Sequence, residues 1–193
     1  MRNIVVAVTG ASGSIYGYRL LTRLRQQKHI QIHLVLSRAA ERTSHIELGY
    51  LAGEWKQFAD FTYPIEDIGC RLASGSFQTD AMVVAPCSVH TLSAIATGLS
   101  SNLIVRAADV CLKERRRLVL MVRETPFHLG HLRAMVAVTE MGAIVAPPIP
   151  GFYTKPKTVE DLVDHSVNRV LDLIGCPNPE TARWDDIPDA NNG

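Results

Sequence analysis

The residues best suited to chemistry follow an apolar run at the start of the chain, in the sequence TGASGSIYG from Thr9 to Gly17. Its three glycines are spaced G-x-x-G-x-x-x-G, which is neither the P-loop pattern nor G-x-G-x-x-G. Glycines let a ligand approach the backbone, and helix N-terminal amides with the hydroxyls of Ser12 and Ser14 attract anions. The turn therefore indicates an anion site, although a capped helix without a ligand would have the same sequence.

Polar residues that can bind oxygen atoms also follow two later apolar runs. Ser37 follows QIHLVL and precedes a helical segment, so its hydroxyl can cap that helix or contact a ligand. Ser88 follows AMVVAP and can cap a second helix. The first amides of that helix, which would bind anionic or carbonyl oxygens, belong to Val89, His90 and Thr91.

Arg123 and Glu124 form a charged pair at the end of the apolar run RLVLMV. Unpaired charges at the end of a buried strand are costly, so this pair needs a ligand or a partner. Arginine suits an oxyanion and glutamate suits proton transfer. An ion pair that only stabilises the fold is the alternative interpretation.

Further cations and hydroxyls lie on separate segments and suggest a second anionic group. Lys113 ends a helical segment, Tyr153 lies in a proline-rich loop, and Arg169 lies on the last helical segment. His128 and His131 form H-x-x-H, but no carboxylate or cysteine nearby completes a ligand set. No metal site is therefore predicted.

Composition excludes several classes of function. The 193 residues carry a net charge of +1, which gives no electrostatic footprint for nucleic acid. The four cysteines are scattered without a C-x-x-C pair, as is typical of reduced thiols. No apolar stretch of membrane-spanning length and no signal peptide is recognisable. We expect a cytoplasmic enzyme with no membrane partner.

The elements that must position these residues alternate between strand and helix patterns. Short apolar runs at 3–8, 31–36, 81–86, 117–122 and 143–146 predict strands buried on both faces of a parallel sheet. Helical patterns cover roughly 15–27, 38–52, 89–98, 102–115, 128–141 and 158–174. The prediction is a single α/β domain, a doubly wound three-layer sandwich, with its ligands at the carboxyl ends of the strands.

Several blocks together resemble one family. They are TGASGSIYG, SGSF, PCSVHTLSAIATG, RAADVCLKERRRLVL, RETPFHLGHLRAM, GAIVAPPIPGFY and the pair Arg183-Trp184. In that order they are similar to the UbiX-type flavin prenyltransferases, which include the subunit-B proteins of phenolic acid decarboxylase systems. The resemblance covers nearly the whole chain, and the blocks around RAADVCLKERR and RETP are highly specific.

The resemblance implies a Rossmann-like flavoprotein that binds FMN and dimethylallyl phosphate without a metal. It implies transfer of the dimethylallyl group to N5 and C6 of reduced FMN, which gives prenylated FMN for UbiD-type decarboxylases. It also implies a homo-oligomer, a dodecamer with sites at subunit contacts. The flavoprotein domain would span 1–175, and the tail 176–193 would pack near the active site or a neighbouring subunit.

The resemblance also assigns roles by position. Gly10, Ala11 and Ser12 would line the flavin, together with Ser37, Ser88, Val89, His90, Thr91 and Arg123. Lys113, Tyr153 and Arg169 would hold the dimethylallyl phosphate. The reactive pocket would be completed by Glu47, Glu124 and Trp184, with Ser12 near N5 and Lys113 at the leaving phosphate. Either Glu124 or the released phosphate would accept the proton lost from C6.

Two other functions compete with this interpretation. A cysteine decarboxylase of the same fold would carry P-x-M-N-x-x-M in a late loop, and no P-x-M-N occurs in the chain. A non-catalytic FMN-binding subunit of an aromatic-acid decarboxylase system would not need Lys113, Glu124, Tyr153 and Arg169 together. Ubiquinone synthesis and aromatic-acid decarboxylation both use the same product, and the sequence does not separate them.

Overall fold

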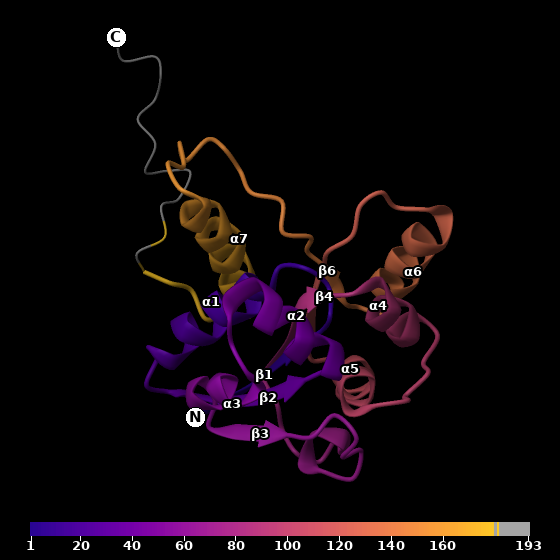
Figure 1. Cartoon of the computed structure of the whole chain (residues 1–193). Helices are drawn as coiled ribbons and strands as arrows, with labels where there is room; N and C mark the ends of the chain where they lie inside the picture. Colours follow the sequence, from indigo (N-terminus) through magenta and orange to yellow (C-terminus); the bar gives the residue numbers. More distant parts are fainter. Residues whose placement is uncertain (180, 182–193) are drawn as a thin grey trace.

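Six parallel strands form one sheet in the order β3-β2-β1-β4-β5-β6. The structure is a computed structural model and describes residues 1–179 and 181 (Figure 1). The strands are β1 (Arg2–Val8), β2 (Ile30–Leu36), β3 (Phe61–Tyr63), β4 (Ala81–Cys87), β5 (Arg117–Val122) and β6 (Ile144–Val145). The chain reverses direction across the sheet between β1 and β4, and this is where doubly wound folds bind ligands.

Helices cover both faces of the sheet (Figure 1). The α-helices are α1 (Ser14–Arg25), α2 (Arg38–Leu48), α3 (Ala52–Trp55), α4 (Val89–Ala96), α5 (Leu103–Lys113), α6 (Leu129–Glu140) and α7 (Val159–Leu173), and short 3-10 helices span Lys56–Phe58 and Arg71–Ala73. None of these helices, within the part of the chain that the structure describes, is long and apolar enough to cross a membrane.

The central strands β1, β4 and β5 are apolar along most of their length, apart from Arg2, Asn3 and Arg117 at their starts, because both faces are covered. In β1, Ile4, Val6 and Val8 join the core under α1 and α7, while Val5 and Ala7 join the core under α4, α5 and α6. The same alternation continues in β4 and β5. Burial on two faces explains why these strands read as continuous apolar runs in the sequence, and it confirms the predicted three-layer α/β architecture.

The element predictions were wrong at two places. The strand β3 was missed, because it has only three residues and pairs at the edge of the sheet through Phe61–Tyr63. The helix predicted over 38–52 ends at Leu48, where Gly49 forms its C-cap, and a separate short helix follows. A glycine commonly ends a helix at its C-cap, and the helix prediction overlooked Gly49 because the helical pattern of apolar residues continues past it.

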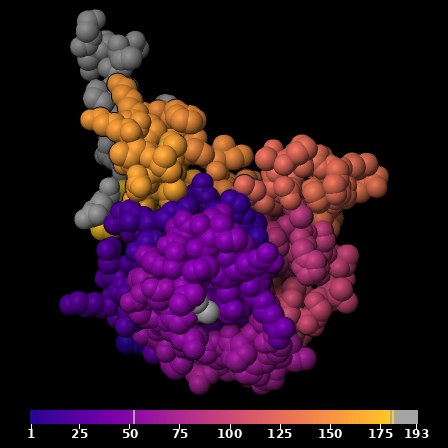
Figure 2. Space-filling model, in the orientation of Figure 1, coloured from indigo at the N-terminus to yellow at the C-terminus, as the bar shows by residue number. Residues whose placement is uncertain are grey.

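The surface is hollowed above the sheet. Figure 2 shows a notch between α7 with its preceding loop on one side and α6 on the other. α6 turns Leu129, Leu132 and Val136 outward, with exposed fractions of 58%, 46% and 58%. An apolar stripe of this kind on a helix is typical of a surface that a further subunit covers.

One buried histidine lies in the sheet away from the predicted site. His33 on β2 is fully buried, with Nδ1 2.9 Å from the Tyr63 hydroxyl and Nε2 3.1 Å from Asn3 Oδ1. Asn3 Nδ2 donates to the Gln78 carbonyl at 2.9 Å, which makes Oδ1 the atom facing His33. Burial, and then the Arg71 charge, lower the pKa of His33 to about 4, although Asp60 acts in the opposite direction.

We expect the fold to weaken as pH falls from about 6.5 to 4, because the unfolded chain binds a proton at His33 that the folded chain refuses. The stabilisation is complete above the ordinary histidine pKa, and its loss should approach about 3 kcal/mol. Urea unfolding measured across this range should show a shallower pH slope in His33→Gln. The control His29→Asn, at an exposed histidine, should keep the full slope. Equal slopes in His33→Gln and the unmodified protein would contradict this.

Candidate active site

The segments that follow β1, β2, β4 and β5 meet at the carboxyl edge of the sheet and are joined by hydrogen bonds. The Ser37 amide donates to the Val8 carbonyl at 3.0 Å, and the Arg123 amide donates to the Cys87 carbonyl at 3.0 Å. The buried Thr9 hydroxyl donates to the Pro86 carbonyl at 2.7 Å and accepts from the Ser88 amide at 2.8 Å. This role of Thr9 was not predicted from the sequence, where the residue only opens the glycine turn.

The glycine turn needs glycine for two different reasons. Gly13 has a φ of 103°, in the left-handed region that side chains disfavour, and it immediately precedes α1. Gly17 packs so closely against β4 that a Cβ atom there would lie 2.5 Å from the Ala85 carbonyl oxygen. The turn thus bends sharply and presses the first turns of α1 against the central strand.

The anion at the N-terminus of α1 is a carboxylate of the chain itself. Glu47, near the end of α2, accepts hydrogen bonds from the Gly13 amide at 3.0 Å and the Ser14 amide at 2.8 Å. Burial raises the pKa of Glu47, but hydrogen bonds from the Ser12 side chain and the Ser14 and Gly13 amides lower it overall. Glu47 is therefore ionised at neutral pH, and it lies beside Ser12.

Two other helix N-termini at this edge remain able to bind oxygen atoms. The Ser37 hydroxyl accepts from the Ala40 amide at 3.0 Å, and the Ser88 hydroxyl accepts from the Thr91 amide at 3.3 Å. Both predicted caps are confirmed. Since the first amides of an α-helix have no intrahelical acceptor, those of Val89 and His90 can donate to a ligand. Gly10 and Ala11 lie in the turn between β1 and α1, where Gly10 packs so closely against Ala39 of α2 that a Cβ atom would clash with it.

Arg123 and Glu124 lie at the end of β5 and are partly buried. The Glu124 carboxylate accepts from the Thr125 amide at 2.9 Å. Among the described residues the two side chains form no ion pair with each other. Tyr16 lies near Arg123: burial raises the pKa of this phenol, and the Arg123 charge opposes the rise. Tyr16 is a residue of this edge that the glycine pattern did not single out.

Tyr153 and Arg169 lie together on α7 and the loop before it. The Tyr153 hydroxyl is 3.4 Å from His165 Nε2, and His165 is one helical turn before Arg169. Arg169 forms an ion pair with Asp172 at 3.2 Å and is otherwise largely exposed. The structure thus brings together two of the three residues expected to hold the dimethylallyl phosphate.

The third, Lys113, lies elsewhere in the protomer. It is the last residue of α5, which leads into the start of β5, and so it lies at the amino edge of the sheet. Its ammonium pairs with Glu114 and lies beside Gly75 of the SGSF block. A site built within one protomer therefore does not include Lys113. Trp184 lies outside the described residues.

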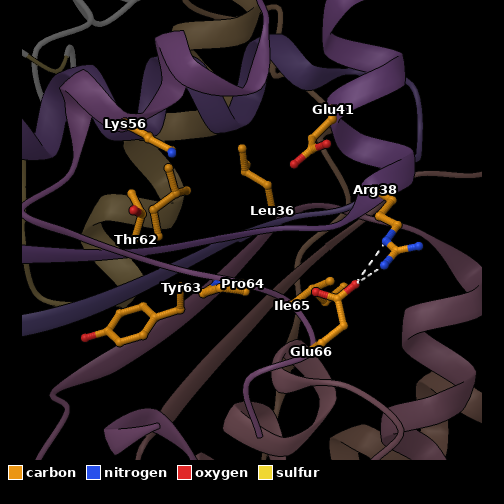
Figure 3. A pocket seen from close by; sticks show the side chains of 10 residues that line it. Leu36, Arg38, Glu41, Lys56, Thr62, Tyr63, Pro64, Ile65 and Glu66 are labelled. Carbon is orange, nitrogen blue, oxygen red and sulfur yellow. Dashed lines mark hydrogen bonds and ion pairs between the residues drawn. The ribbon is translucent and has the colours of Figure 1, made fainter.

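Two cavities open near the carboxyl edge. One of about 320 Å³ is lined by Ser12, Gly13 and Glu47 from the turn side and by Val159 and Val163 of α7. A larger one of about 510 Å³ lies beside β2 and β3 (Figure 3). There the Arg38–Glu66 ion pair, at 2.6 Å, lies on the same side as Glu41, and Lys56 lies on the other side (Figure 3). None of the predicted site residues lines the larger cavity.

The donor set at this edge fits FMN, with phosphate and ring carbonyl oxygens to bind. Serine caps and free first-turn amides at two helices, together with the Arg123 guanidinium, supply hydrogen bonds to oxygen at separated points. In the described part of the chain no three histidine, cysteine or carboxylate side chains are grouped to hold a metal ion.

Comparison with known proteins decides the family. The Flavoprotein family matches residues 1–171. The flavin prenyltransferase UbiX of Neisseria meningitidis is 50% identical over 98% of this chain and 100% of its own length. The chain belongs to the UbiX family of flavin prenyltransferases. Its alignment with that relative runs from end to end, so the family assignment covers the whole fold and not one motif.

Two solved structures of UbiX relatives superpose closely. AnUbiX (PadA1), in complex with FMN and dimethylallyl pyrophosphate, has a TM-score of 0.92 and 47% identity, covering 95% of this chain and 97% of its own. A dodecameric FMN-dependent UbiX-like decarboxylase from Escherichia coli O157:H7 also has a TM-score of 0.92, with 44% identity over 94% of this chain and 98% of its own. Both confirm the predicted Rossmann-like flavoprotein fold.

We expect Glu47→Gln to lower the free energy of unfolding by about 0.5–1 kcal/mol at neutral pH, because the amide keeps the hydrogen-bond acceptor but loses its charge at the α1 N-terminus. Because the folded-state pKa of Glu47 is lowered, the difference from the unmodified protein should shrink as pH falls through the carboxyl range. Urea unfolding at pH 7 and pH 4 measures this. Glu140→Gln, at the exposed end of α6, is the control and should be neutral. A difference that persists unchanged at pH 4 would contradict the electrostatic account.

Proposed function

We propose that the chain is a flavin prenyltransferase that joins the dimethylallyl group of dimethylallyl phosphate to N5 and C6 of reduced FMN and releases phosphate. The proposal rests on the 50% identity to a UbiX enzyme over 98% of this chain. It also rests on the anion-binding helix N-termini at the carboxyl edge of the sheet. Reduced FMN supplies the nucleophilic ring, and the product would serve UbiD-type decarboxylases. The four free cysteines support a cytoplasmic location.

The residues of the carboxyl edge would bind and orient FMN. Ser37, Ser88 and the first amides of α4 offer donors to its phosphate and carbonyl oxygens, and Arg123 adds a fixed positive charge. Gly10, Ala11 and Ser12 would line the ring. Holding the ring beside the allylic carbon converts an encounter of two molecules into a reaction of positioned groups.

Positive charge must stabilise the leaving phosphate, since the allylic C–O bond breaks with both electrons leaving on oxygen. Tyr153 and Arg169 supply a hydroxyl donor and a guanidinium from one cluster. Ionised Glu47, beside Ser12, would face the positive charge that develops on the allyl group. Glu124 or the released phosphate would take the proton lost from C6. Trp184 would close the pocket.

Lys113 would serve the site of a neighbouring subunit. It lies at the opposite edge from Glu124 within one protomer, and the relative from Escherichia coli O157:H7 is dodecameric. The outward apolar stripe of α6 gives a surface on which copies of the chain could pack. We therefore propose a dodecamer whose subunit contacts complete each phosphate site.

Anaerobic incubation with reduced FMN and dimethylallyl phosphate, without added metal, should yield extracted flavin heavier by one isoprenoid unit, with release of phosphate. Glu124→Gln should bind FMN normally and form at least tenfold less product, because proton removal from C6 loses its carboxylate. Mass spectrometry and a phosphate assay measure both, and a parallel reaction with dimethylallyl diphosphate identifies the preferred donor. Unmodified flavin returned by a protein that binds FMN would favour the non-catalytic subunit instead.

Mixed oligomers test the placement of Lys113. Lys113→Ala and Glu124→Gln should each form at least tenfold less product alone. Oligomers assembled from an equal mixture should regain about a quarter of the full activity, since half the hosts keep Glu124 and half the neighbours keep Lys113. The control is Lys113→Ala mixed with Lys113→Ala,Glu124→Gln, which cannot form a complete site. A mixture of the two single variants that stays as inactive as this control would show that both residues act in one protomer's site.

A further inference from the structure

His165 lies between Tyr153 and Arg169, and neither the family's motifs nor the proposed chemistry gives it a role. It is on α7, where its Nδ1 atom accepts a hydrogen bond from the Gly151 amide at 3.3 Å and its Nε2 atom lies 3.4 Å from the Tyr153 hydroxyl. The two rings pack edge to face with their centroids 5.7 Å apart. One imidazole thus contacts the proline-rich loop at two points two residues apart.

The Gly151 contact fixes which nitrogen of His165 carries the hydrogen. A backbone amide can only donate, so Nδ1 must be the acceptor and the hydrogen of the neutral ring is on Nε2. Burial, and then the Arg169 charge, lower the pKa of His165, so the ring is neutral at neutral pH. Nε2–H therefore donates to the Tyr153 oxygen, so the phenol is the acceptor in this contact and the hydrogen of its hydroxyl points away from the imidazole.

The hydrogen bond from His165 determines the direction in which the Tyr153 hydroxyl can donate to an anion. The loop leaves β6 through Pro147, Pro148 and Pro150, and the Tyr153 side chain is 41% exposed. A hydroxyl on such a segment would sample many directions unless a more rigid element held it. α7 is that element: it packs against α1, and its Asp164 binds both Arg19 and Arg23.

We propose that His165 is a positioning residue for the prenyl donor, holding the Tyr153 oxygen through Nε2–H so that the phenolic hydrogen points to the phosphate beside Arg169. The inference rests on the proposed function, since it assigns that phosphate to this cluster. It gives the histidine no contact with the flavin and no part in proton transfer. Its effect passes entirely through Tyr153.

Calorimetric titration of dimethylallyl phosphate into protein loaded with oxidised FMN measures donor binding without turnover. We expect His165→Phe, which keeps an aromatic ring against Tyr153, to weaken donor binding about tenfold while FMN affinity is unchanged. Tyr153→Phe should weaken it similarly, and the double variant no more than Tyr153→Phe alone, because the two residues act through one hydrogen bond. His165→Gln, whose amide can still donate, should recover part of the loss.

Three outcomes would overturn the inference. Donor affinity in His165→Phe could equal that of the unmodified protein, or the two substitutions could add independently, or His165→Gln could bind no better than His165→Phe. If instead the unmodified protein binds FMN but neither binds nor transfers the dimethylallyl group, the proposed function itself falls and takes this inference with it. Normal FMN affinity in every variant excludes misfolding as the cause of a loss.

Discussion

The site depends on the contact between the ends of β1 and β4, which Thr9 holds together. Its hydroxyl donates to the Pro86 carbonyl and accepts from the Ser88 amide, so the glycine turn and the start of α4 are fixed relative to each other. In a parallel sheet these two strands are neighbours only because the chain crosses from β3 at one edge back to the centre. The crossover opens the crevice at the carboxyl edge, and the threonine joins the two segments that border it. Ser37 and Arg123 are then attached to the same frame by backbone hydrogen bonds to Val8 and Cys87.

Glu47 occupies the anion position that the glycine turn would otherwise offer to a ligand. A turn of this kind before a helix is normally a phosphate site, because its amides and the helix dipole favour negative charge. Here the chain supplies that charge itself, and the helix N-terminus instead fixes a carboxylate beside Ser12. The ligand's own anionic groups are therefore left to α2, α4 and the cations. An ionised carboxylate that the chain holds in one place would stabilise a developing allyl cation. A second phosphate at this turn would belong to a ligand, and the protein would not hold it in one place in the same way.

Features that depend on a few adjacent residues could be predicted from the sequence. Features that depend on contacts with distant parts of the chain could not. The five apolar strands and the serine caps of α2 and α4 were predictable, since burial on two faces and helix capping leave marks in a few adjacent residues. The strand β3 was not, because an edge strand of three residues is held by its neighbour β2 and not by its own pattern. The contact of Glu47 with the glycine turn was not predictable either, because Gly13 and Ser14 lie 34 and 33 residues away along the chain. Tyr16 and His165 left no signal at all, because their partners are more than ten residues away.

If Lys113 holds the leaving phosphate, as proposed above, a single protomer is an incomplete unit of function, because Lys113 lies at the amino edge of the sheet. Ionising an allylic C–O bond without a metal requires several fixed cations around one phosphate, and the carboxyl edge of this chain offers Arg123 and, through α7, Arg169. Placing Lys113 there as well would require α5 to run the other way along the sheet, which the right-handed crossover from β4 to β5 forbids. A lysine at the amino edge can reach such a phosphate only from another copy of the chain. Assembly would then contribute charge to the reaction as well as stability, and the outward stripe on α6 supplies the apolar surface for that assembly.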